Sequence, residues 1–600
     1  MADQIQRRHR PQPSKAAYGS DIVAELLKGF GIEYLALNPG ATFRGLHDSV
    51  VNFGGNVMPE VILCTHEEIT VGIANGYARA KGRPMAAAVH DIVGLQHAAT
   101  AIYNAWCDRA PVLVLGGTGP MDTSQRRPWI DWVHTALVQG NQVRDYVKWD
   151  DQPAGLRAIP ASFARAYRLA TTDPPGPVYL CYDAALQEAP VTEPVLLADL
   201  QTHLAAVPPQ APAAVLDQLA AWLVEAEHPV AIADMMGRNP RAVPLLVRLA
   251  ELLGIPVIDR GGRLNFPNTH PLDAAGIADD LLSRADLVLA LDVQDLYGAL
   301  CPSRTRKDVR AVQPIVPEEA RLVHVTLEPY VVRSWANDFN ELQPVDLPIL
   351  ASSAEVLDAL IPLVQDRLAR NAARQARCRE RSEAVRAARD RVRRQWAEEA
   401  ARQADQRPIS SWRFYRELWE AIRHEDWVHV SGTSRWGERR VWEYAEAGRY
   451  LGGSRGGGLG YGISQAVGGA LALKGSGKLC VNVQSDGDLL YAPGALWTLT
   501  HHRIPLLIVM YNNRSYYNDE EHQEEMAKQR GRPVENKGIG IHLRDPNPNF
   551  AGLARDLGLW AEGPIEDPAA MGPALQRALR VVKDGGTALV DVVVQAGSRA

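Results

Sequence analysis

The chain has 600 residues, with 64 basic and 70 acidic side chains and a formal net charge of −6. A mildly acidic protein of this kind is not expected to bind nucleic acid through a general basic surface. The six cysteines are scattered singly, without zinc-finger or redox spacing, which predicts free thiols in a reducing, cytoplasmic location. The longest apolar runs, such as "IPLLIVMY", are too short to span a membrane. The polar, basic N-terminus does not have the apolar core of a secretory signal.

Three stretches of the chain repeat one pattern, in which a short apolar strand is followed by a turn and a helix. They cover residues 18–190, 205–365 and 406–600. Apolar strands that alternate with helices predict parallel sheets covered on both faces, so the expected fold class is α/β with three doubly wound domains. Residues 1–17 are expected to form a disordered lead-in. Residues 366–405 are rich in Ala, Arg and Glu and lack Gly and Pro, which predicts an exposed helical linker.

The predicted strands are short runs rich in β-branched residues or leucine. In chain order they are residues 32–38, 59–64, 85–90, 111–116 and 177–182 in the first segment, 229–234, 255–260, 285–292 and 321–329 in the second, and 427–430, 478–484, 504–511 and 587–594 in the third.

The helix predicted over residues 65–82, "THEEITVGIANGYARAKG", begins with the pattern of a capping box. Thr65 takes the N-cap position and Glu68 the third helical position, which leaves Glu67 free to point elsewhere. An acid in the first turn also complements the helix dipole. The local pattern alone therefore leaves the role of Glu67 open.

Two further features of the first segment are candidate site residues. One strand ends at His90, at the edge of the sheet where ligands collect; a satisfied strand-end histidine is the structural alternative. The stretch 122–149 is dense in Trp, His and Arg. Trp129, Trp132 and His134 are candidates to line a pocket, with packing in the core or at an interface as the alternative.

Residues 485–515 place polar side chains after two successive apolar strands, the first leading to Asp486 and the second to Asn513. If the two strands are neighbours in a parallel sheet, their carboxyl ends meet at one edge. A carboxylate, an amide oxygen and a nearby main-chain carbonyl supply half of an octahedral shell for Mg²⁺, which phosphates and water complete. Gly487 allows close approach of a phosphate to the backbone. A plain βαβ unit with turn residues at its corners is the alternative.

This stretch resembles the cofactor signature of thiamine diphosphate (ThDP) enzymes, Gly-Asp-Gly followed about one βαβ unit later by Asn-Asn. The chain departs from it at Ser485, which replaces the first Gly. The residues that the resemblance assigns to Mg²⁺ are Asp486, Asn513 and, through its carbonyl, Ser515. Those that it assigns to the adjoining cofactor are Gly487, Asp488, Ser515 and Tyr516.

Two more motifs agree with this resemblance. The family's catalytic glutamate, which contacts the pyrimidine ring, lies ten residues before the Tyr of Gly-Tyr-Ala, and counting back from Tyr77 gives Glu67. The stretch "GGSRGGGLGYGISQA" resembles the turn that holds the cofactor bent, with an apolar wedge between its rings, and "SGTS" lies at a cofactor-contacting position. The cofactor-binding residues assigned in this way are Thr433, Ser434, Gly457 and Leu459.

The closest likeness is to the acetolactate synthase and benzoylformate decarboxylase type. It implies a pyrimidine-binding, a central and a diphosphate-binding domain, and an active site between two chains of a homodimer or homotetramer. It implies an enzyme that cleaves or forms a carbon–carbon bond beside the carbonyl of a 2-oxo acid, with or without an aldehyde or ketone acceptor. The alternatives are a 2-hydroxyacyl-CoA lyase or oxalyl-CoA decarboxylase-like enzyme acting on an acyl-CoA, and a non-catalytic regulatory relative. Some relatives bind FAD or coenzyme A in the central domain, but no dinucleotide fingerprint is present here, so a structural role is expected.

Within the family that the chain resembles, decarboxylases and synthases differ at the position of His90. Benzoylformate decarboxylase has a proton-relaying histidine at this place, whereas acetolactate synthases have a Ser-Gly-Pro-Gly turn, and the shared "YNAW" at residues 103–106 supports the alignment. Ala41 replaces a serine that meets the substrate carboxylate in benzoylformate decarboxylase, and His97 replaces an Asn usual in both relatives. The donor and acceptor substrates therefore stay open.

Overall fold

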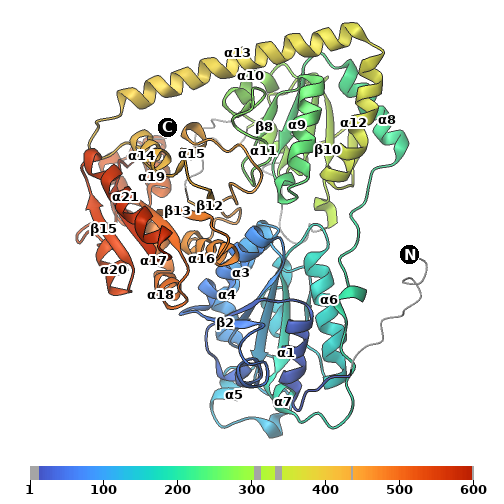
Figure 1. Ribbon diagram of the computed structural model, residues 1–600, viewed down its shortest axis with the longest axis vertical. Helices are drawn as coiled ribbons and strands as arrows, with labels where there is room; N and C mark the ends of the chain where they lie inside the picture. The colour runs from blue at the N-terminus through green and yellow to red at the C-terminus, as the bar shows by residue number, and fades with distance from the viewer. Residues whose placement is uncertain (1–12, 303–311, 331–340, 434–436, 597–600) are drawn as a thin grey trace. The chain divides into compact units, whose positions relative to one another are not determined.

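The computed structural model describes residues 13–302, 312–330, 341–433 and 437–596. Contacts divide the chain into two compact units, and each is described by itself. The first unit comprises Met1–Val207, Ser454–Ser476 and Asp488–Ile504, and the second comprises Pro208–Gly453, Gly477–Gly487 and Pro505–Ala600. Each of the three predicted segments contributes its own sheet (Figure 1).

Every strand pairing in these sheets is parallel, which confirms the predicted α/β class. The first sheet has the order β2-β1-β3-β4-β6-β5, with β1 Tyr34–Leu37, β2 Glu60–Leu63, β3 Met85–Val89, β4 Val112–Thr118, β5 Asp150–Asp151 and β6 Val178–Asp183. The second has the order β11-β10-β9-β7-β8, with β7 Pro229–Ala233, β8 Val257–Asp259, β9 Leu287–Leu291, β10 Arg321–Val325 and β11 Leu347–Ile349. The third has the order β12-β13-β14-β16-β15, with β12 Trp427–Gly432, β13 Leu479–Ser485, β14 Leu506–Asn512, β15 Trp560–Ile565 and β16 Thr587–Val593.

The two strands that lead to the predicted metal ligands, β13 and β14, are direct neighbours. Their register pairs Ser485 with Tyr511, so both strands end at the same edge of the third sheet. Both strands are buried over almost their whole length, as expected for a parallel sheet covered on both faces. The neighbour relation on which the predicted metal site depends is therefore present.

The first unit surrounds its sheet with helices from two distant parts of the sequence. Those from its N-terminal part are α1 Gly19–Gly29, α2 Arg44–Asp48, α3 Glu67–Lys81, α4 Ile92–Cys107, α5 Ile130–Val133, α6 Ile159–Thr171 and α7 Ala184–Glu188; those from its C-terminal part are α16 Tyr461–Leu473 and α18 Gly494–His501. Helix α17, Asp486–Tyr491, begins at the boundary between the two units.

Helices α3 and α16 pack at backbone distance. A Cβ atom on Gly76 of α3 would overlap the main-chain carbonyl of Gln465, and one on Gly468 of α16 would overlap the carbonyl of Ile73. Two facing glycines therefore permit a contact that no larger side chain could make.

A buried carboxylate joins helices α3, α4 and α16. Asp108, fully buried at the end of α4, accepts hydrogen bonds from Asn75 Nδ2 and Gln465 Nε2, both at 2.9 Å. It also accepts from the backbone N–H of Arg455 at 2.7 Å. Since an unpaired buried carboxylate is costly, these bonds fix the relative placement of the three helices within the unit.

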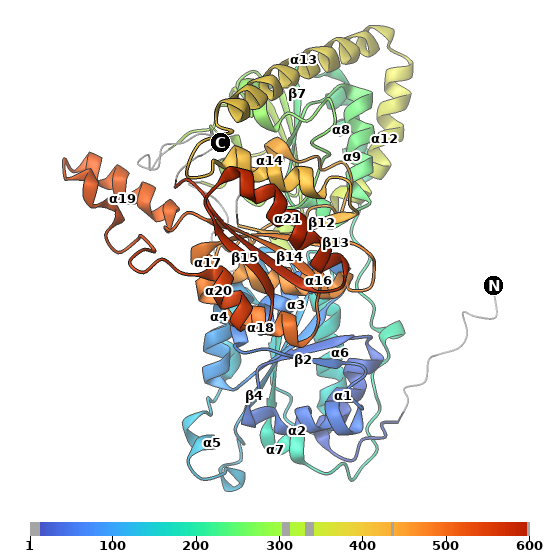
Figure 2. The ribbon, with the colours of Figure 1, turned by 60° about the vertical axis from the view of Figure 1, so that its left-hand side comes forward.

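The second unit holds the remaining helices. They are α8 Ala213–Glu225, α9 Ala242–Leu253, α10 Ala278–Leu282, α11 Leu296–Leu300, α12 Ser353–Ala369, α13 Ala372–Arg402, α14 Ser411–Ile422, α15 Glu438–Val441, α19 Tyr517–Gln529, α20 Phe550–Asp556 and α21 Pro568–Lys583. Helices α14 and α21 cover one face of the third sheet, with Phe414 of α14 and Met571 of α21 in its core (Figure 2).

Helix α13 is the predicted helical segment, and it runs along the central domain (Figure 1). Cys378 and Val385 enter the hydrophobic core of that domain. The guanidinium of Arg381 donates to the carbonyls of Gly254 at 3.2 Å and Glu227 at 3.0 Å. The helix is mostly exposed, as predicted, but it is anchored to the central domain along one side.

The start of the described chain differs from its prediction. Ser14 N–H donates to the carbonyl of Val195 at 2.8 Å, and Val191 N–H donates to the carbonyl of Ala17 at 2.9 Å. Residues 13–17 are therefore held by a distant segment, which local composition could not indicate; residues 1–12 lie outside the described part. The strands missed in the sequence, β5, β11 and β15, lie at sheet edges, where short length, proline or glycine weakens the strand pattern.

Two expectations about the whole chain can be compared with the described residues. All six cysteines are free thiols, as predicted from their spacing. Throughout the part of the chain that the structure describes, no helix combines the length and apolar character needed to cross a membrane.

Candidate active site

Asp486 lies in the second unit, directly after β13, and is only 2% exposed. Its carboxylate accepts the N–H of Gly487 at 2.9 Å and the N–H of Ser515 at 3.3 Å. Burial raises the pKa of Asp486 to about 6, although these backbone hydrogen bonds oppose the change. The side chain is thus placed at the end of β14 as well as β13.

Asn513 and Ser515 form the other half of this group. The side-chain oxygen of Asn513 accepts the N–H of Ser515 at 3.0 Å, and Arg514 between them has a left-handed backbone, with φ of 57°. This tight turn turns Ser515 back toward Asp486, and the Ser515 hydroxyl donates to Glu520 at 2.8 Å. The three residues predicted to bind Mg²⁺ therefore lie together at one sheet edge.

The donor set at this edge suits a hard divalent cation. Carboxylate, amide and carbonyl oxygens are the ligands that Mg²⁺ prefers. Among the described residues, no Lys, Arg or His side chain forms an ion pair with Asp486. A buried carboxylate without a protein cation is stabilised by a bound metal ion, so the residues present fit Mg²⁺.

Three neighbouring predicted residues shape the backbone of the same edge. The Thr433 hydroxyl accepts the N–H of Ser485 at 3.0 Å, which ties the end of β12 to that of β13. A Cβ on Gly487 would overlap the ring of Tyr516, so only glycine permits that ring to lie over the turn. Ser434, also predicted to contact the cofactor, lies outside the described residues.

The glycine-rich turn before α16 belongs to the first unit and is held by Asn104 of α4. The Asn104 side chain donates to the carbonyl of Gly458 at 2.9 Å and accepts its N–H at 3.0 Å. Gly457, whose carbonyl is the predicted pyrimidine contact, has φ of 64° and is exposed, and Leu459 is partly exposed. The turn therefore presents both residues on a fixed backbone.

Asp488 has a structural part in this turn. Its buried carboxylate accepts the N–H groups of Gly460 at 2.9 Å and Gly462 at 3.0 Å. N–H groups at the start of a helix have no carbonyl partner within the helix, and the Asp488 carboxylate supplies the acceptor here. Asp488 thus anchors the helix that carries Leu459 at its entrance, and direct contact with a cofactor stays a prediction.

The predicted capping box at the start of α3 is wrong. His66, not Thr65, is the N-cap, and its Nδ1 accepts the N–H of Glu68 at 3.1 Å. Glu68 instead approaches Gly460, and burial, together with the nearby Asp488 carboxylate, raises the pKa of Glu68 to about 7. An imidazole can replace the usual hydroxyl at the N-cap because its unprotonated nitrogen also accepts a hydrogen bond.

Glu67, the predicted catalytic acid, is only 6% exposed and has two histidines beside it. His97 Nδ1 lies 3.8 Å from Glu67 Oε2 and 2.9 Å from His66 Nε2, and the two imidazole rings are stacked. Since His66 Nδ1 accepts from Glu68, its Nε2 carries the proton of the neutral ring. Nε2 of His66 therefore donates a hydrogen bond to Nδ1 of His97.

His90 lies close to Glu67 in a narrow slot between two glycines. A Cβ on Gly40 would lie 2.6 Å from His90 Nδ1, and one on Gly94 would lie 2.7 Å from His90 Cβ and 2.8 Å from Glu67 Oε1. His90 Nδ1 also lies 3.0 Å from the hydroxyl of Thr42. Burial lowers the pKa of His90, with Asp91 acting in the opposite direction. The structure thus brings the two predicted catalytic residues together.

Asp91 and His134 lie on the other side of His90, and Asp91 was not predicted as a site residue. Asp91 is fully buried; its Oδ2 lies 3.2 Å from His90 Nε2 and 3.0 Å from His134 Nδ1. Burial raises the pKa of Asp91, and both imidazoles oppose the change. His134 follows α5, more than 40 positions along the chain from His90, so no local pattern could predict this contact.

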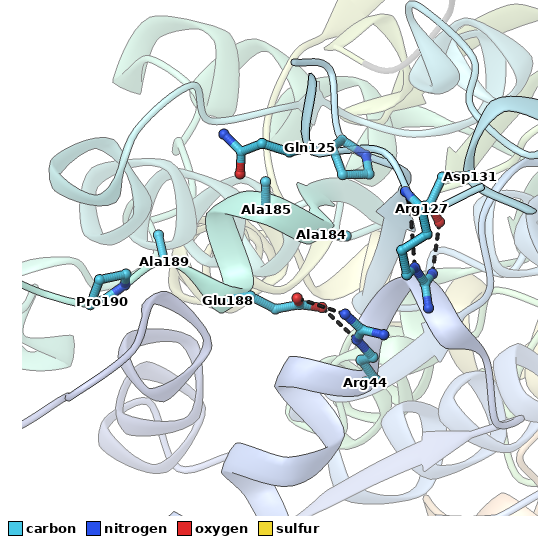
Figure 3. Close-up of a pocket in the computed structure, with 10 residues that line it drawn as sticks. Arg44, Gln125, Arg127, Asp131, Ala184, Ala185, Glu188, Ala189 and Pro190 are labelled. Carbon is cyan, nitrogen blue, oxygen red and sulfur yellow. Dashed lines mark hydrogen bonds and ion pairs between the residues drawn. The ribbon is translucent and has the colours of Figure 1, made fainter. Parts of the chain in front are cut away.

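A small pocket adjoins the segment that carries His134. Its volume is about 250 Å³ and its walls include Arg44 and Arg127, each paired with an acid (Figure 3). Arg127 donates to the Asp131 carboxylate from its backbone N–H at 2.7 Å, from Nε at 3.1 Å and from Nη2 at 2.7 Å. Trp129 and Trp132 nearby are 68% and 63% exposed, which rules out packing in the core of this chain.

Comparison with known proteins matches all three domains. The models that match are those of the thiamine pyrophosphate enzyme N-terminal TPP binding domain at residues 18–141, central domain at 216–360 and C-terminal TPP binding domain at 430–592. The chain thus belongs to the thiamine diphosphate-dependent enzymes, and within them it is of the decarboxylase and carboligase type.

Similar proteins come from both branches that the sequence suggested. A benzoylformate decarboxylase of Pseudomonas aeruginosa is 28% identical over 515 residues, covering 82% of this chain and 85% of that protein. A probable acetolactate synthase large subunit of Methanocaldococcus jannaschii is 23% identical over 561 residues, covering 91% and 87%. The fold matches that of a 4-hydroxybenzoylformate decarboxylase of Rhodococcus jostii with a TM-score of 0.72 at 19% identity, over 97% of this chain and 100% of that one.

Proposed function

We propose that this chain is a Mg²⁺-dependent 2-oxo acid decarboxylase that releases an aldehyde. The observation that carries the proposal is the placement of His90, which is held in its glycine slot beside Glu67 and against Thr42. A positioned imidazole next to the predicted catalytic acid favours proton delivery to the product carbon. An acetolactate synthase-like enzyme would instead need to protect that carbon from protons until the second carbonyl compound arrives.

The proposed cofactor and metal ligands are residues described above. Asp486, Asn513 and the carbonyl of Ser515 would hold Mg²⁺, and the turn at Gly457 and Leu459 would hold the pyrimidine and the bend of ThDP. When bound, ThDP supplies a nucleophilic carbon that adds to the substrate carbonyl and an electron sink for the electrons left when CO₂ departs.

Glu67 would activate the cofactor by hydrogen-bonding its pyrimidine ring. Its burial suits that role, because a hydrogen bond between a carboxyl group and a ring nitrogen is stronger where water is excluded. His66 and His97 border the carboxylate on one side and Gly94 on the other. The carboxylate is thereby limited to a narrow range of orientations.

His90 would supply the proton that replaces the departing carboxylate. The overall change converts a 2-oxo carboxylate and one proton into an aldehyde and CO₂, so one proton must reach the former carbonyl carbon. The Thr42 hydroxyl holds Nδ1 of His90, and the Asp91 carboxylate beside Nε2 favours a proton at that atom. Burial lowers the pKa of His90, and Asp91 acts in the opposite direction, so the carboxylate helps His90 to carry the proton that it would deliver.

The substrate proposed is a 2-oxo acid without a coenzyme A group. The similar proteins named above are a benzoylformate decarboxylase and an acetolactate synthase, so benzoylformate and pyruvate are the first compounds to test. Ala41 removes the hydroxyl found in benzoylformate decarboxylase, which favours a different contact with the substrate carboxylate. A homodimer or homotetramer with a shared active site and a cytoplasmic location also stay predictions.

A panel of 2-oxo acids, assayed for CO₂ and aldehyde with ThDP and Mg²⁺, tests the proposal. A positioned general acid contributes about a hundred- to ten-thousand-fold, so His90→Ala should slow aldehyde release by that order while cofactor binding stays intact. His47→Ala, on the exposed side of α2, is the matched control and should keep the wild-type rate. Wild-type activity in His90→Ala would remove His90 from the mechanism.

Carboligation is the second candidate, because the likeness to an acetolactate synthase covers 91% of the chain. Adding an aldehyde acceptor to the same assay separates the two reactions. A decarboxylase gives mainly aldehyde, and His90→Ala should raise its share of hydroxyketone. If wild type and His90→Ala both give only hydroxyketone, the proposed decarboxylase is contradicted.

A further inference from the structure

His90, Asp91 and His134 bring three metal-ligating atoms together in the first unit. His90 Nε2, Asp91 Oδ2 and His134 Nδ1 all lie within 4.8 Å of one another. Two of the separations are 3.2 and 3.0 Å. Two ligands at about 2.1 Å from one ion and at right angles to each other lie about 3.0 Å apart, so these spacings suit coordination of a single ion.

The atoms converge, with Asp91 Oδ2 at ion-pair distance from both imidazoles. Asp91 Oδ2 and His134 Nδ1 are buried and form no hydrogen bond within the part of the chain that the structure describes, although they lie only 3.0 Å apart. The neighbouring His66–His97 pair behaves differently, since its facing nitrogens are hydrogen-bonded at 2.9 Å. Asp91 Oδ2 and His134 Nδ1 of the first cluster could thus bind a shared ion, whereas the facing nitrogens of His66 and His97 are joined by a hydrogen bond.

The surroundings of the cluster have the features of a metal site. Thr42 holds Nδ1 of His90, which leaves Nε2 as the ligating atom, and Asp91 Oδ1 accepts the N–H of Val93 at 3.2 Å, which leaves Oδ2. Such outer hydrogen bonds fix the orientation of metal ligands. The Arg127–Asp131 hydrogen bonds anchor the turn that precedes His134, and the N–H of His134 donates to the carbonyl of Ile130 at 3.1 Å.

The charge of the cluster also favours binding of a cation. Asp91 is fully buried and Glu67 is nearby, while Arg127 is the basic group that acts on His90. A divalent ion would compensate the buried carboxylate more fully than the neutral imidazoles do. Two imidazoles and one carboxylate suit Zn²⁺, Fe²⁺ or Co²⁺ better than Mg²⁺, which prefers oxygen ligands.

We propose that His90, Asp91 and His134 form a binding site for a divalent transition-metal ion, separate from the Mg²⁺ site predicted at Asp486. This inference goes beyond the proposed decarboxylase. An ion at this site takes His90 Nε2 away from proton transfer, so the same residue would serve either as an acid or as a ligand. Zn²⁺ would therefore act as an inhibitor of aldehyde release.

Binding of Co²⁺ to the full chain tests the site without any need for activity. The protein is stripped with chelator, left free of ThDP and Mg²⁺, and titrated with Co²⁺ while its visible absorption is recorded, with Zn²⁺ displacement measured by calorimetry. One equivalent of ion with nitrogen-containing coordination is expected. His134→Ala and Asp91→Asn should abolish this equivalent, and Thr42→Val should weaken it about ten- to a hundred-fold because an outer hydrogen bond is lost.

Two control variants identify which cluster binds the ion. Asp486→Asn should retain the Co²⁺ equivalent, because it removes only the predicted Mg²⁺ site, and His97→Ala should retain it because that histidine is already hydrogen-bonded. Asp91→Asn keeps a side chain able to cap α4, so it remains informative if His134→Ala folds poorly. Unchanged binding in both ligand variants, loss of binding in Asp486→Asn, or no binding by wild type would overturn the site. Absence of 2-oxo acid decarboxylation would contradict the proposed function but not this site.

Discussion

Asp486 is a buried carboxylate with backbone hydrogen bonds but no protein cation to neutralise it. Raising the pKa of Asp486 from 3.8 to about 6 corresponds to on the order of 3 kcal/mol of unfavourable free energy in the ionised, metal-free protein. For an acid whose pKa is higher in the folded state, stability is full below pH 3.8 and is lost as the pH rises through about 6. Once a cation binds, the ionised Asp486 carboxylate would stabilise the folded protein instead.

We therefore expect Asp486→Asn to have opposite effects with and without ligand. In chelator at pH 7.5, the variant should unfold at a higher temperature than wild type, and the difference should shrink as the pH is lowered from about 6 to about 4. With ThDP and Mg²⁺, wild type should gain stability and the variant should not. Thermal unfolding followed by fluorescence measures both; a variant that is less stable in chelator at pH 7.5 would contradict the assignment.

Glu67 and Glu68 are adjacent acids with different surroundings, so they form a matched pair of variants. Glu67→Gln should bind ThDP with nearly normal affinity, but proton exchange at the reactive carbon of ThDP should slow by about a hundred- to ten-thousand-fold, as expected for loss of acid–base catalysis. Glu68→Gln should exchange at close to the wild-type rate, because Glu68 faces Gly460 and Asp488. Exchange measured by NMR decides between them, and the reverse pattern would transfer the role to Glu68.

At the scale of elements, the contact between α3 and α16 brings the two backbones so close that only glycine fits between them. It joins the helix that begins with Glu67 to the helix that follows the glycine-rich turn, and it depends on Gly76 and Gly468. The Asp108 hydrogen bonds hold both helices from the side. A change in this contact would displace Glu67 relative to the glycine-rich turn without altering either of them directly.

Gly76→Ala should therefore destabilise the protein. Its methyl group would overlap the backbone of Gln465, and forcing extra atoms into a packed site costs about 1–3 kcal/mol. Gly29→Ala is the control, since no atom lies within 4 Å of its added methyl group at the exposed end of α1. Thermal midpoints should fall for Gly76→Ala and stay equal or rise slightly for Gly29→Ala. Equal midpoints for Gly76→Ala and wild type would mean that the helices can separate without penalty.

The sequence allowed prediction of the central strands, because long buried strands have continuous apolar runs bounded by turns. That pattern predicted that Asp486 and Asn513 would meet if β13 and β14 were neighbours, which the structure shows, and the family resemblance added Ser515. Edge strands such as β11 were missed because three residues including a proline give no strand signal. Asp108 and Asn104 were missed because their partners lie far along the chain, and the contact of Asp91 with His134 was missed for the same reason. The error at Glu68 arose because a histidine N-cap is not part of the usual capping pattern.

At the scale of the whole molecule, the predicted functional residues fall into both compact units. Glu67 and His90 belong to the first, and Asp486, Asn513 and Ser515 to the second. Enzymes of this family are generally oligomeric, and we predict that the active site lies between two chains. A C₂ dimer would then contain two equivalent sites, each using Glu67 of one chain and Asp486 of the other.

A mixture of two inactive variants tests this arrangement. Glu67→Gln and Asp486→Asn chains, co-expressed and combined at random, should regain roughly a quarter of the wild-type activity, because half of the dimers are mixed and each has one intact site. Decarboxylation rates of the purified random mixture provide the measurement, and mixed dimers isolated with two different tags should reach about half of the wild-type activity. If each site lies within one chain, the mixture should be no more active than either variant alone.

The composition of the first unit has a consequence for how the protein is made. Its core is built from Met1–Val207 together with Ser454–Ser476 and Asp488–Ile504. On the ribosome, α3 emerges long before α16, so its glycine face stays exposed to solvent while about 400 further residues are translated, at roughly 5–20 residues per second. We expect the nascent chain to need protection by chaperones during this interval, and a fragment that stops at residue 207 to aggregate when expressed alone.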